Sequence, residues 1–106
     1  MKRGDLVTVA VSGDYGKPRP ALIVQADAFD RHPSVIVLPL TSEIHETPLF
    51  RVTVAAGRET GLLKPSQIMV DKATAVPRAK LGARIGQVNA ATMQAVGEAL
   101  RGLLGL

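Results

Sequence analysis

The sequence predicts a mainly β protein, a small barrel or strongly bent sheet closed or flanked by one C-terminal helix. Two observations predict this fold class. Short apolar and β-branched runs, separated by turn-forming residues, fill the first two thirds of the chain, as in small all-β domains. After Asn89 the apolar residues recur at helical spacing instead. The length of 106 residues is close to the commonest size of one domain, so we expect a single domain over residues 1–106.

Several strands are expected in the β part of the chain. Each is a run rich in Val, Ile and Leu, or alternates apolar with polar residues. Residues 34–40 are apolar on both faces, so we expect a buried central strand there. The alternation in residues 49–54 puts Phe50, Val52 and Val54 on one face. The expected strands are residues 6–11, 20–25, 34–40, 49–54, 67–70 and 85–88.

The end of the chain has the signals of an amphipathic helix over about residues 90–104. Asn89 is a good N-cap, because its side chain can accept a hydrogen bond from a free backbone amide of the first turn. Gly105 is near the end of the helix. The apolar positions of this helix are Met93, Val96, Leu100 and Leu103. A shorter helical turn is expected over residues 78–81, because Pro77 suits a first helical position.

The composition indicates a globular protein with an aliphatic core. Apolar residues make up 46% of the chain, but only Tyr15, Phe29 and Phe50 are aromatic. The absence of cysteine excludes disulfides, thiolate metal sites and a cysteine nucleophile. The first residues are too few and too charged for a signal peptide, and no stretch approaches 18 apolar residues. We expect a cytoplasmic protein with no membrane segment.

The charge gives weak support for a polyanionic partner. The formal net charge is +4, which many soluble domains carry. Four cations, Lys72, Arg78, Lys80 and Arg84, follow one another with no acid between them. On charge alone, an ordinary solvated surface is the favoured interpretation.

Several standard catalytic sites are missing from the sequence. There is no glycine-rich phosphate loop, no helix with paired histidines and no nucleophile elbow. His32 and His45 lie in expected loops without a metal-ligand pattern, so we expect both at the surface. A catalytic site in this chain therefore has to use arginine, hydroxyl groups and backbone amides, with no metal and no cofactor.

Six short segments carry a resemblance that covers nearly the whole chain. They are residues 3–5 (RGD), 16–24 (GKPRPALIV), 37–42 (VLPLTS), 60–62 (TGL), 66–71 (SQIMVD) and 81–88 (LGARIGQV). Each segment alone is a weak signal. Together, in this order, they resemble the motifs of the MazF/PemK toxin family.

The resemblance implies an SH3-like barrel with a terminal helix, assembled as a two-fold homodimer. It implies a sequence-specific endoribonuclease toxin that cuts single-stranded RNA, leaving a 2′,3′-cyclic phosphate and a 5′-hydroxyl. It also implies an antitoxin whose extended acidic tail lies over the RNA groove, and a toxin–antitoxin pair that binds DNA. The implied catalytic residues are Arg19 and Thr41. The implied RNA contacts are Lys17, Pro18, Ser42, Lys64, Ser66 and Gln67.

This chain departs from the family pattern near the implied RNA-contacting edge. Ser66 stands where an acidic residue is common, and Met69 stands where the family has an arginine. The loop of residues 12–17 is also short. The base preference of the family therefore does not carry over to this chain.

Elementary chemistry gives Arg19 and Thr41 suitable roles. Attack of a 2′-oxygen on the adjacent phosphorus builds negative charge on the non-bridging oxygens. A planar guanidinium can meet two such oxygens, and a threonine hydroxyl can donate one further hydrogen bond. The group that takes the 2′-proton is open between a deprotonated Arg19, His45 and solvent.

Two other functions compete with RNA cleavage. A toxin of the same fold that poisons DNA gyrase would not need the pairing of Arg19 with Thr41. A non-catalytic barrel that binds RNA or peptide usually presents aromatic platforms, and three aromatic residues in all suit that role poorly.

Pairing of two copies is expected from the small size of the chain. One helix covers a bent sheet only in part, and the apolar strand ends near Leu40 and Leu49 are expected to need a partner. The two copies would line one groove with Lys17, Arg19 and residues 64–72. Such a groove would suit RNA, or equally an acidic peptide.

Overall fold

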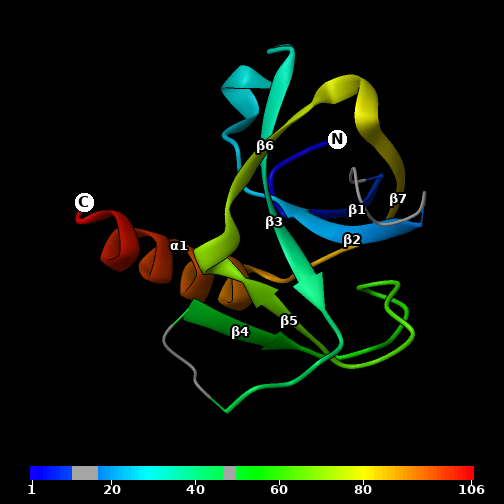
Figure 1. The fold of residues 1–106 in the computed structure, drawn as a ribbon, viewed down its shortest axis with the longest axis vertical. Helices are drawn as coiled ribbons and strands as arrows, with labels where there is room; N and C mark the ends of the chain where they lie inside the picture. Colours follow the sequence, from blue (N-terminus) through cyan, green and yellow to red (C-terminus); the bar gives the residue numbers. More distant parts are fainter. Residues whose placement is uncertain (11–16, 47–49) are drawn as a thin grey trace.

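The computed structural model describes residues 1–10, 17–46 and 50–106. Within these ranges the chain forms seven strands, three short 3-10 helices and one α-helix, shown in Figure 1. The strands are β1 (Asp5–Ala10), β2 (Pro18–Ile23), β3 (Ser34–Thr41), β4 (Arg51–Val54), β5 (Ser66–Met69), β6 (Thr74–Pro77) and β7 (Leu81–Gln87). The helices are η1 (Asp27–Phe29), η3 (Val70–Lys72), η4 (Arg78–Lys80) and α1 (Ala90–Leu104).

The described strands form one bent antiparallel sheet in which β3 belongs to two halves. The strand order is β4-β5-β3-β2-β1-β7, and β6 also pairs with β3. Residues 34–39 of β3 pair with β2 and β6, whereas Leu40 and Thr41 pair with β5. In Figure 1, β3 is the long strand that runs from the β2 side to the β5 side. The mainly β fold class with one C-terminal helix is confirmed.

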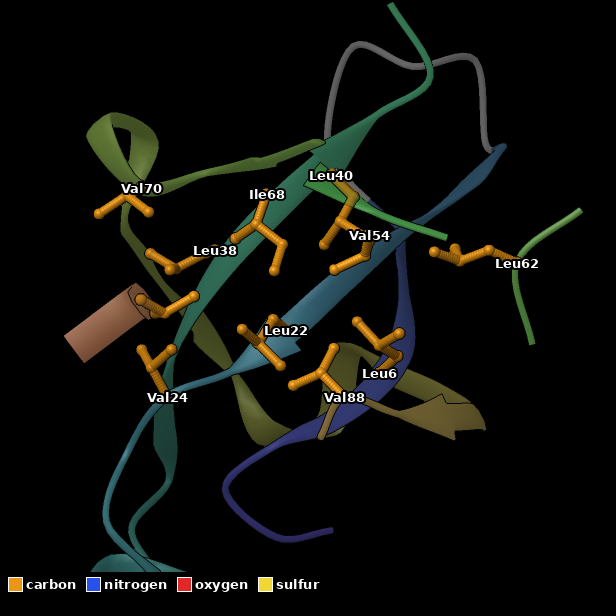
Figure 2. Close-up of a cluster of buried hydrophobic side chains, with 11 residues drawn as sticks. Leu6, Leu22, Val24, Leu38, Leu40, Val54, Leu62, Ile68, Val70 and Val88 are labelled. Carbon is orange, nitrogen blue, oxygen red and sulfur yellow. The ribbon is translucent and has the colours of Figure 1, made fainter. Parts of the chain in front are cut away.

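Two clusters of buried side chains use opposite faces of β3. Val35 and Val37 join a smaller cluster with residues of β1 and β2. Leu38 and Leu40 join the larger cluster, drawn in Figure 2. The expectation of a central strand that is apolar on both faces is therefore confirmed. Helix α1 covers the larger cluster through Val96, whose side chain is fully buried.

The signals at the two ends of α1 act as expected. The Asn89 side chain accepts a hydrogen bond from the backbone N–H of Thr92 at 2.8 Å. Gly105 ends the helix with a left-handed φ of 69°, which glycine adopts at little cost. Met93 and Leu100 pack against the core, but Leu103 is exposed, so the apolar face is shorter than its spacing suggested. The turn after Pro77 is present as η4.

Other expectations about the strands need correction. Strand β2 begins two residues earlier than expected, which puts Arg19 inside a strand, and it ends at Ile23. Val70 belongs to η3 and not to a strand. Strand β6 was not expected, because its residues show no apolar pattern typical of a strand. It is a strand because it pairs with β3. Val11, Leu49 and residues 12–16 of the predicted loop lie outside the described residues, so the predictions made for them are not compared with the structure.

The argument that Leu40 needs a partner chain is wrong. Its side chain is buried inside the larger cluster of its own chain, because β3 crosses to β5 at this residue. Exposed apolar side chains occur elsewhere, and they include Ile44, Leu63, Leu104 and Leu106.

The fold uses half of the cationic run between residues 72 and 84. The Arg78 guanidinium donates to the carbonyls of His32, at 2.8 Å, and Phe29, at 3.3 Å. Arg84 donates to the carboxylate of Asp5 at 3.0 Å. These two arginines therefore stabilise the fold, and the run is a weaker sign of a polyanion site than its length suggested.

The N-terminal motif of residues 3–5 is a tight turn that leads into β1. The Arg3 guanidinium donates to the Val24 carbonyl, and the Gly4 N–H donates to the Ile23 carbonyl at 2.8 Å. Asp5 accepts from the backbone N–H of Lys2 at 2.8 Å and from Arg84. Burial raises the pKa of Asp5, but the Lys2 amide and the Arg84 guanidinium outweigh it, so the net pKa is lowered.

The lowered pKa of Asp5 predicts a loss of stability in acid. A carboxylate with a depressed native pKa stabilises the fold above its unfolded pKa, near 3.8, and that contribution disappears as pH falls through the native value. Asp5→Asn is expected to lower the free energy of unfolding by about 1–2 kcal/mol at pH 7, allowing for the exposure of Arg84. Urea unfolding at pH 7 and pH 3 checks this, with Asp30→Asn as the control of equal charge change. An equal loss for Asp5→Asn at both pH values would contradict the ionic origin.

Candidate functional site

Arg19 and Thr41 lie on the same face of the sheet, where β2 and β3 separate. The last β2–β3 pair in this direction is Ala21 opposite Pro39. Beyond that pair the two strands separate, with Arg19 paired to Val9 of β1 and Thr41 paired to Gln67 of β5. Alternate residues of a strand share a face, so Arg19 lies on the side of Ala21, and Thr41 lies on the side of Val37. Arg19 is exposed and Thr41 is half-buried.

The hydroxyl of Thr41 is held by the turn that follows β3. Its Oγ1 atom accepts a hydrogen bond from the backbone N–H of Glu43 at 3.1 Å. A threonine hydroxyl has two lone pairs and one proton. Because the amide occupies a lone pair, the hydroxyl proton is left to donate to a further group. A hydroxyl held in this way can donate to an oxyanion.

The structure separates the six implied contact residues into two groups. Lys17, Pro18, Ser42 and Lys64 are exposed. Ser66 and Gln67 are 5% and 4% exposed. The Ser66 hydroxyl donates to the Lys64 carbonyl at 3.0 Å, so it fixes the start of β5.

The pairing of β3 with β5 brings Gln67 beside Thr41. Thr41 pairs with Gln67 in β5, and Gln67 pairs with Thr53 in β4. The start of β2, the end of β3 and the start of β5 supply the candidate residues, except that Lys17, Ser42 and Lys64 lie just outside these strands. Sequence reasoning placed Gln67 in this region, but it missed that the side chain is enclosed.

The site contains no arrangement that points to a metal. Among residues 1–10, 17–46 and 50–106, no three His, Asp or Glu side chains lie close enough together to hold a metal ion. His32 and His45 are both exposed, as expected.

A hollow of about 390 Å³ lies away from Arg19 and Thr41. Its walls are the end of β4, the loop of residues 55–60 and the first turn of α1. A flexible polymer binds along a surface and does not need an enclosed pocket, so we place the site by its chemical groups and not by this hollow. Within the described part of the chain, no helix is long and apolar enough to cross a membrane.

Comparison with known proteins matches almost the whole chain. The family model described as "PemK-like, MazF-like toxin of type II toxin-antitoxin system" matches residues 2–104. A relative from Mycolicibacterium smegmatis, named "Probable endoribonuclease MazF", is 43% identical over an alignment of 107 positions that covers 100% of this chain and 98% of the relative.

Solved structures agree with the sequence comparison. The Mycobacterium tuberculosis toxin MazF-mt6 has a TM-score of 0.82 and 27% identity, over 96% of this chain and 97% of that chain. A mycobacterial endoribonuclease in complex with its cognate antitoxin has a TM-score of 0.80 and 28% identity, over 100% of this chain and 96% of that chain.

Proposed function

The chain belongs to the PemK-like, MazF-like toxins of type II toxin–antitoxin systems, and we propose that it cuts single-stranded RNA without a metal. The observation that carries the proposal is the placement of Arg19 and Thr41 on one face, with the Thr41 hydroxyl prepared as a donor by Glu43. The relatives named as endoribonucleases favour RNA cleavage over poisoning of DNA gyrase.

The proposed reaction is an internal transfer of the phosphoryl group. The RNA 2′-oxygen attacks the adjacent phosphorus, and the bond from phosphorus to the 5′-oxygen breaks. The 2′-proton leaves, and the departing 5′-oxygen takes up a proton. The products are a 2′,3′-cyclic phosphate and a 5′-hydroxyl. Arg19 would stabilise the charge on the non-bridging oxygens, and Thr41 would donate one hydrogen bond to them.

The ends of the cut RNA test this mechanism directly. On a long mixed-sequence RNA in excess EDTA, we expect undiminished cleavage, with 2′,3′-cyclic phosphate and 5′-hydroxyl ends. A 2′-deoxynucleotide on the 5′ side of a mapped cut is expected to abolish that cut, because the nucleophile is missing. A requirement for Mg²⁺, or 5′-phosphate ends, would overturn the proposal.

The proposed RNA surface consists of the exposed residues around the site. Lys17, Pro18, Ser42 and Lys64 can reach a nucleotide chain, whereas Ser66 and Gln67 support this surface from inside. We propose a homodimer in which the two sites form one groove. Leu63 is 98% exposed next to Lys64 in the sequence, and Ile44, which follows Thr41 by three residues, is 50% exposed, so a second copy of the chain could cover them. An acidic antitoxin tail would compete with RNA for the groove.

The groove predicts RNA binding that depends steeply on salt. Single-stranded nucleic acid releases about 0.7 counterion per phosphate contact, so three to six contacts give a log–log slope of about −2 to −4. Lys64→Ala is expected to make this slope less negative, and an acidic peptide is expected to displace RNA. Fluorescence anisotropy at several salt concentrations measures both effects. Binding that is insensitive to salt would contradict the groove, and sedimentation of a fully active monomer at micromolar concentration would contradict the dimer.

A further inference from the structure

Gln67 lies in a row of three polar residues on the face of β4, β5 and the end of β3 that is opposite the larger core cluster. The register sets Thr53 in β4 beside Gln67 in β5, and Gln67 beside Thr41 in β3. Their strand neighbours Val54, Ile68 and Leu40 point into the larger core cluster, so the row faces away from that cluster. A polar residue on such a face is normally solvated. Gln67 is nevertheless 4% exposed.

The Gln67 side chain binds the backbone of His45 from both sides of its amide. Its Oε1 atom accepts from the His45 N–H at 3.0 Å, and its Nε2 atom donates to the His45 carbonyl at 2.9 Å. The Nε2 atom also donates to Thr53 Oγ1 at 3.3 Å. Both N–H bonds of the amide are thus in use. The amide has no donor left for RNA unless it releases His45 or Thr53.

The turn held in this way is the one that orients Thr41. Residues 42–46 leave β3 directly after Thr41, and the Glu43 N–H in this turn donates to Thr41 Oγ1. Thr41 pairs with Gln67 through the backbone, and His45 is bound by the Gln67 side chain. One residue therefore fixes both ends of the turn, and the amide that orients the Thr41 hydroxyl lies between them.

We propose that Gln67 is a positioning residue for RNA cleavage, acting through the turn of residues 42–46 on the hydroxyl of Thr41. This inference rests on the proposed function, in which Thr41 donates to the phosphate. Without the Gln67 side chain the His45 end of the turn loses its attachment to β5, and the Glu43 amide no longer holds the Thr41 hydroxyl in one direction. A donor displaced by about 1 Å weakens transition-state stabilisation without removing substrate contacts. The rate of the chemical step therefore falls, and RNA affinity stays nearly the same.

Two substitutions at Gln67 remove the N–H group that donates to the His45 carbonyl, one without and one with an acceptor left in its place. Gln67→Met keeps the size and removes all the hydrogen bonds. Gln67→Glu keeps an acceptor for the His45 N–H but sets a carboxylate oxygen against the His45 carbonyl. Thr53→Val is the matched control, since it removes only the third partner of the amide. Circular dichroism and thermal unfolding establish whether each variant is folded.

The test measures kcat and KM at an RNA site mapped with the unaltered protein. Both Gln67 variants are expected to lose about 10- to 100-fold in kcat, with KM within about threefold and Thr53→Val near normal. A double mutant with Thr41→Val is expected to be no slower than Thr41→Val alone, because the two residues act through one hydroxyl. Additive losses, a rise in KM alone, unchanged kcat, or failure of both variants to fold would each overturn the inference. Full activity of Thr41→Val would instead overturn the proposed catalytic site.

Discussion

Arg19→Ala is expected to lower RNA cleavage by about 100- to 1,000-fold, which is the usual effect of removing one preorganised donor from an oxyanion. Arg19 is exposed at the start of β2, on the opposite side of the sheet from Leu22 of the larger core cluster. Because its own side chain is exposed and belongs to neither core cluster, the fold is expected to be retained. Thr41→Val, which keeps the shape of the side chain, is expected to show a loss of the same order.

The controls separate the role of Arg19 in the reaction from its charge. Arg31→Ala removes an exposed arginine from the segment between η1 and β3, and it is expected to leave cleavage unchanged. Arg19→Lys keeps the charge but offers no planar pair of donors, so only partial activity is expected. Single-turnover cleavage with saturating protein measures the chemical step. Full activity of a folded Arg19→Ala protein would remove Arg19 from the site.

The sequence predicted those elements best whose signals are local. The bounds of α1 follow from Asn89, Gly105 and the apolar spacing between them, and all three features act within a few residues. The central strand was recognisable because both of its faces are covered, so it carries a continuous apolar run. By contrast, β6 is short and mostly exposed. It is a strand because β3 offers it a partner, which no local pattern reveals.

The chemistry of the site stays a prediction, and the structure adds how its strands are arranged. Arg19 and Thr41 were identified through the family resemblance, and each lies two residues beyond the last β2–β3 pair. The burial of Gln67 and Leu40 could not be predicted in the same way. Both residues are covered by segments that are distant in the sequence. Gln67 is in contact with His45, and Leu40 is covered where β3 pairs with β5. In the sequence, the one signal for the role of Gln67 is a glutamine within a predicted strand. The hydrogen bonds that occupy its side-chain amide are visible only in the structure.

The second large effect is expected on the free energy of unfolding, from substitutions at two glycines. They lie where the loop of residues 57–62 packs against β7. The N–H of Gln87 donates to the Glu59 carbonyl at 2.9 Å, and Leu62 is buried in the larger cluster. Two glycines allow this approach. A Cβ atom on Gly61 would lie 1.9 Å from the Ile85 carbonyl oxygen, and one on Gly86 would lie 2.3 Å from the Thr60 carbonyl carbon. Both obstacles are backbone atoms, so no side chain can move away to relieve the overlap.

Gly61→Ala and Gly86→Ala are therefore each expected to lower the free energy of unfolding by at least about 3 kcal/mol, through overpacking. Gly61→Ala adds the strain of a left-handed φ of 72°, about 1 kcal/mol or more for a residue with a side chain. At this chain length, 3 kcal/mol corresponds to a Tm lower by roughly 12 °C or more.

Gly97→Ala is the matched control for both glycine variants, because a Cβ atom at Gly97 meets nothing within 4 Å among the described residues. Gly97 lies inside α1, where alanine is favoured over glycine by about 0.5–1 kcal/mol, so the same substitution is expected to raise Tm by a few degrees. Thermal unfolding followed by circular dichroism compares the three variants. A Gly86→Ala protein as stable as Gly97→Ala would show that the loop of residues 57–62 can leave β7 without loss. In that case the contact between the two backbones would not be what holds this side of the sheet together.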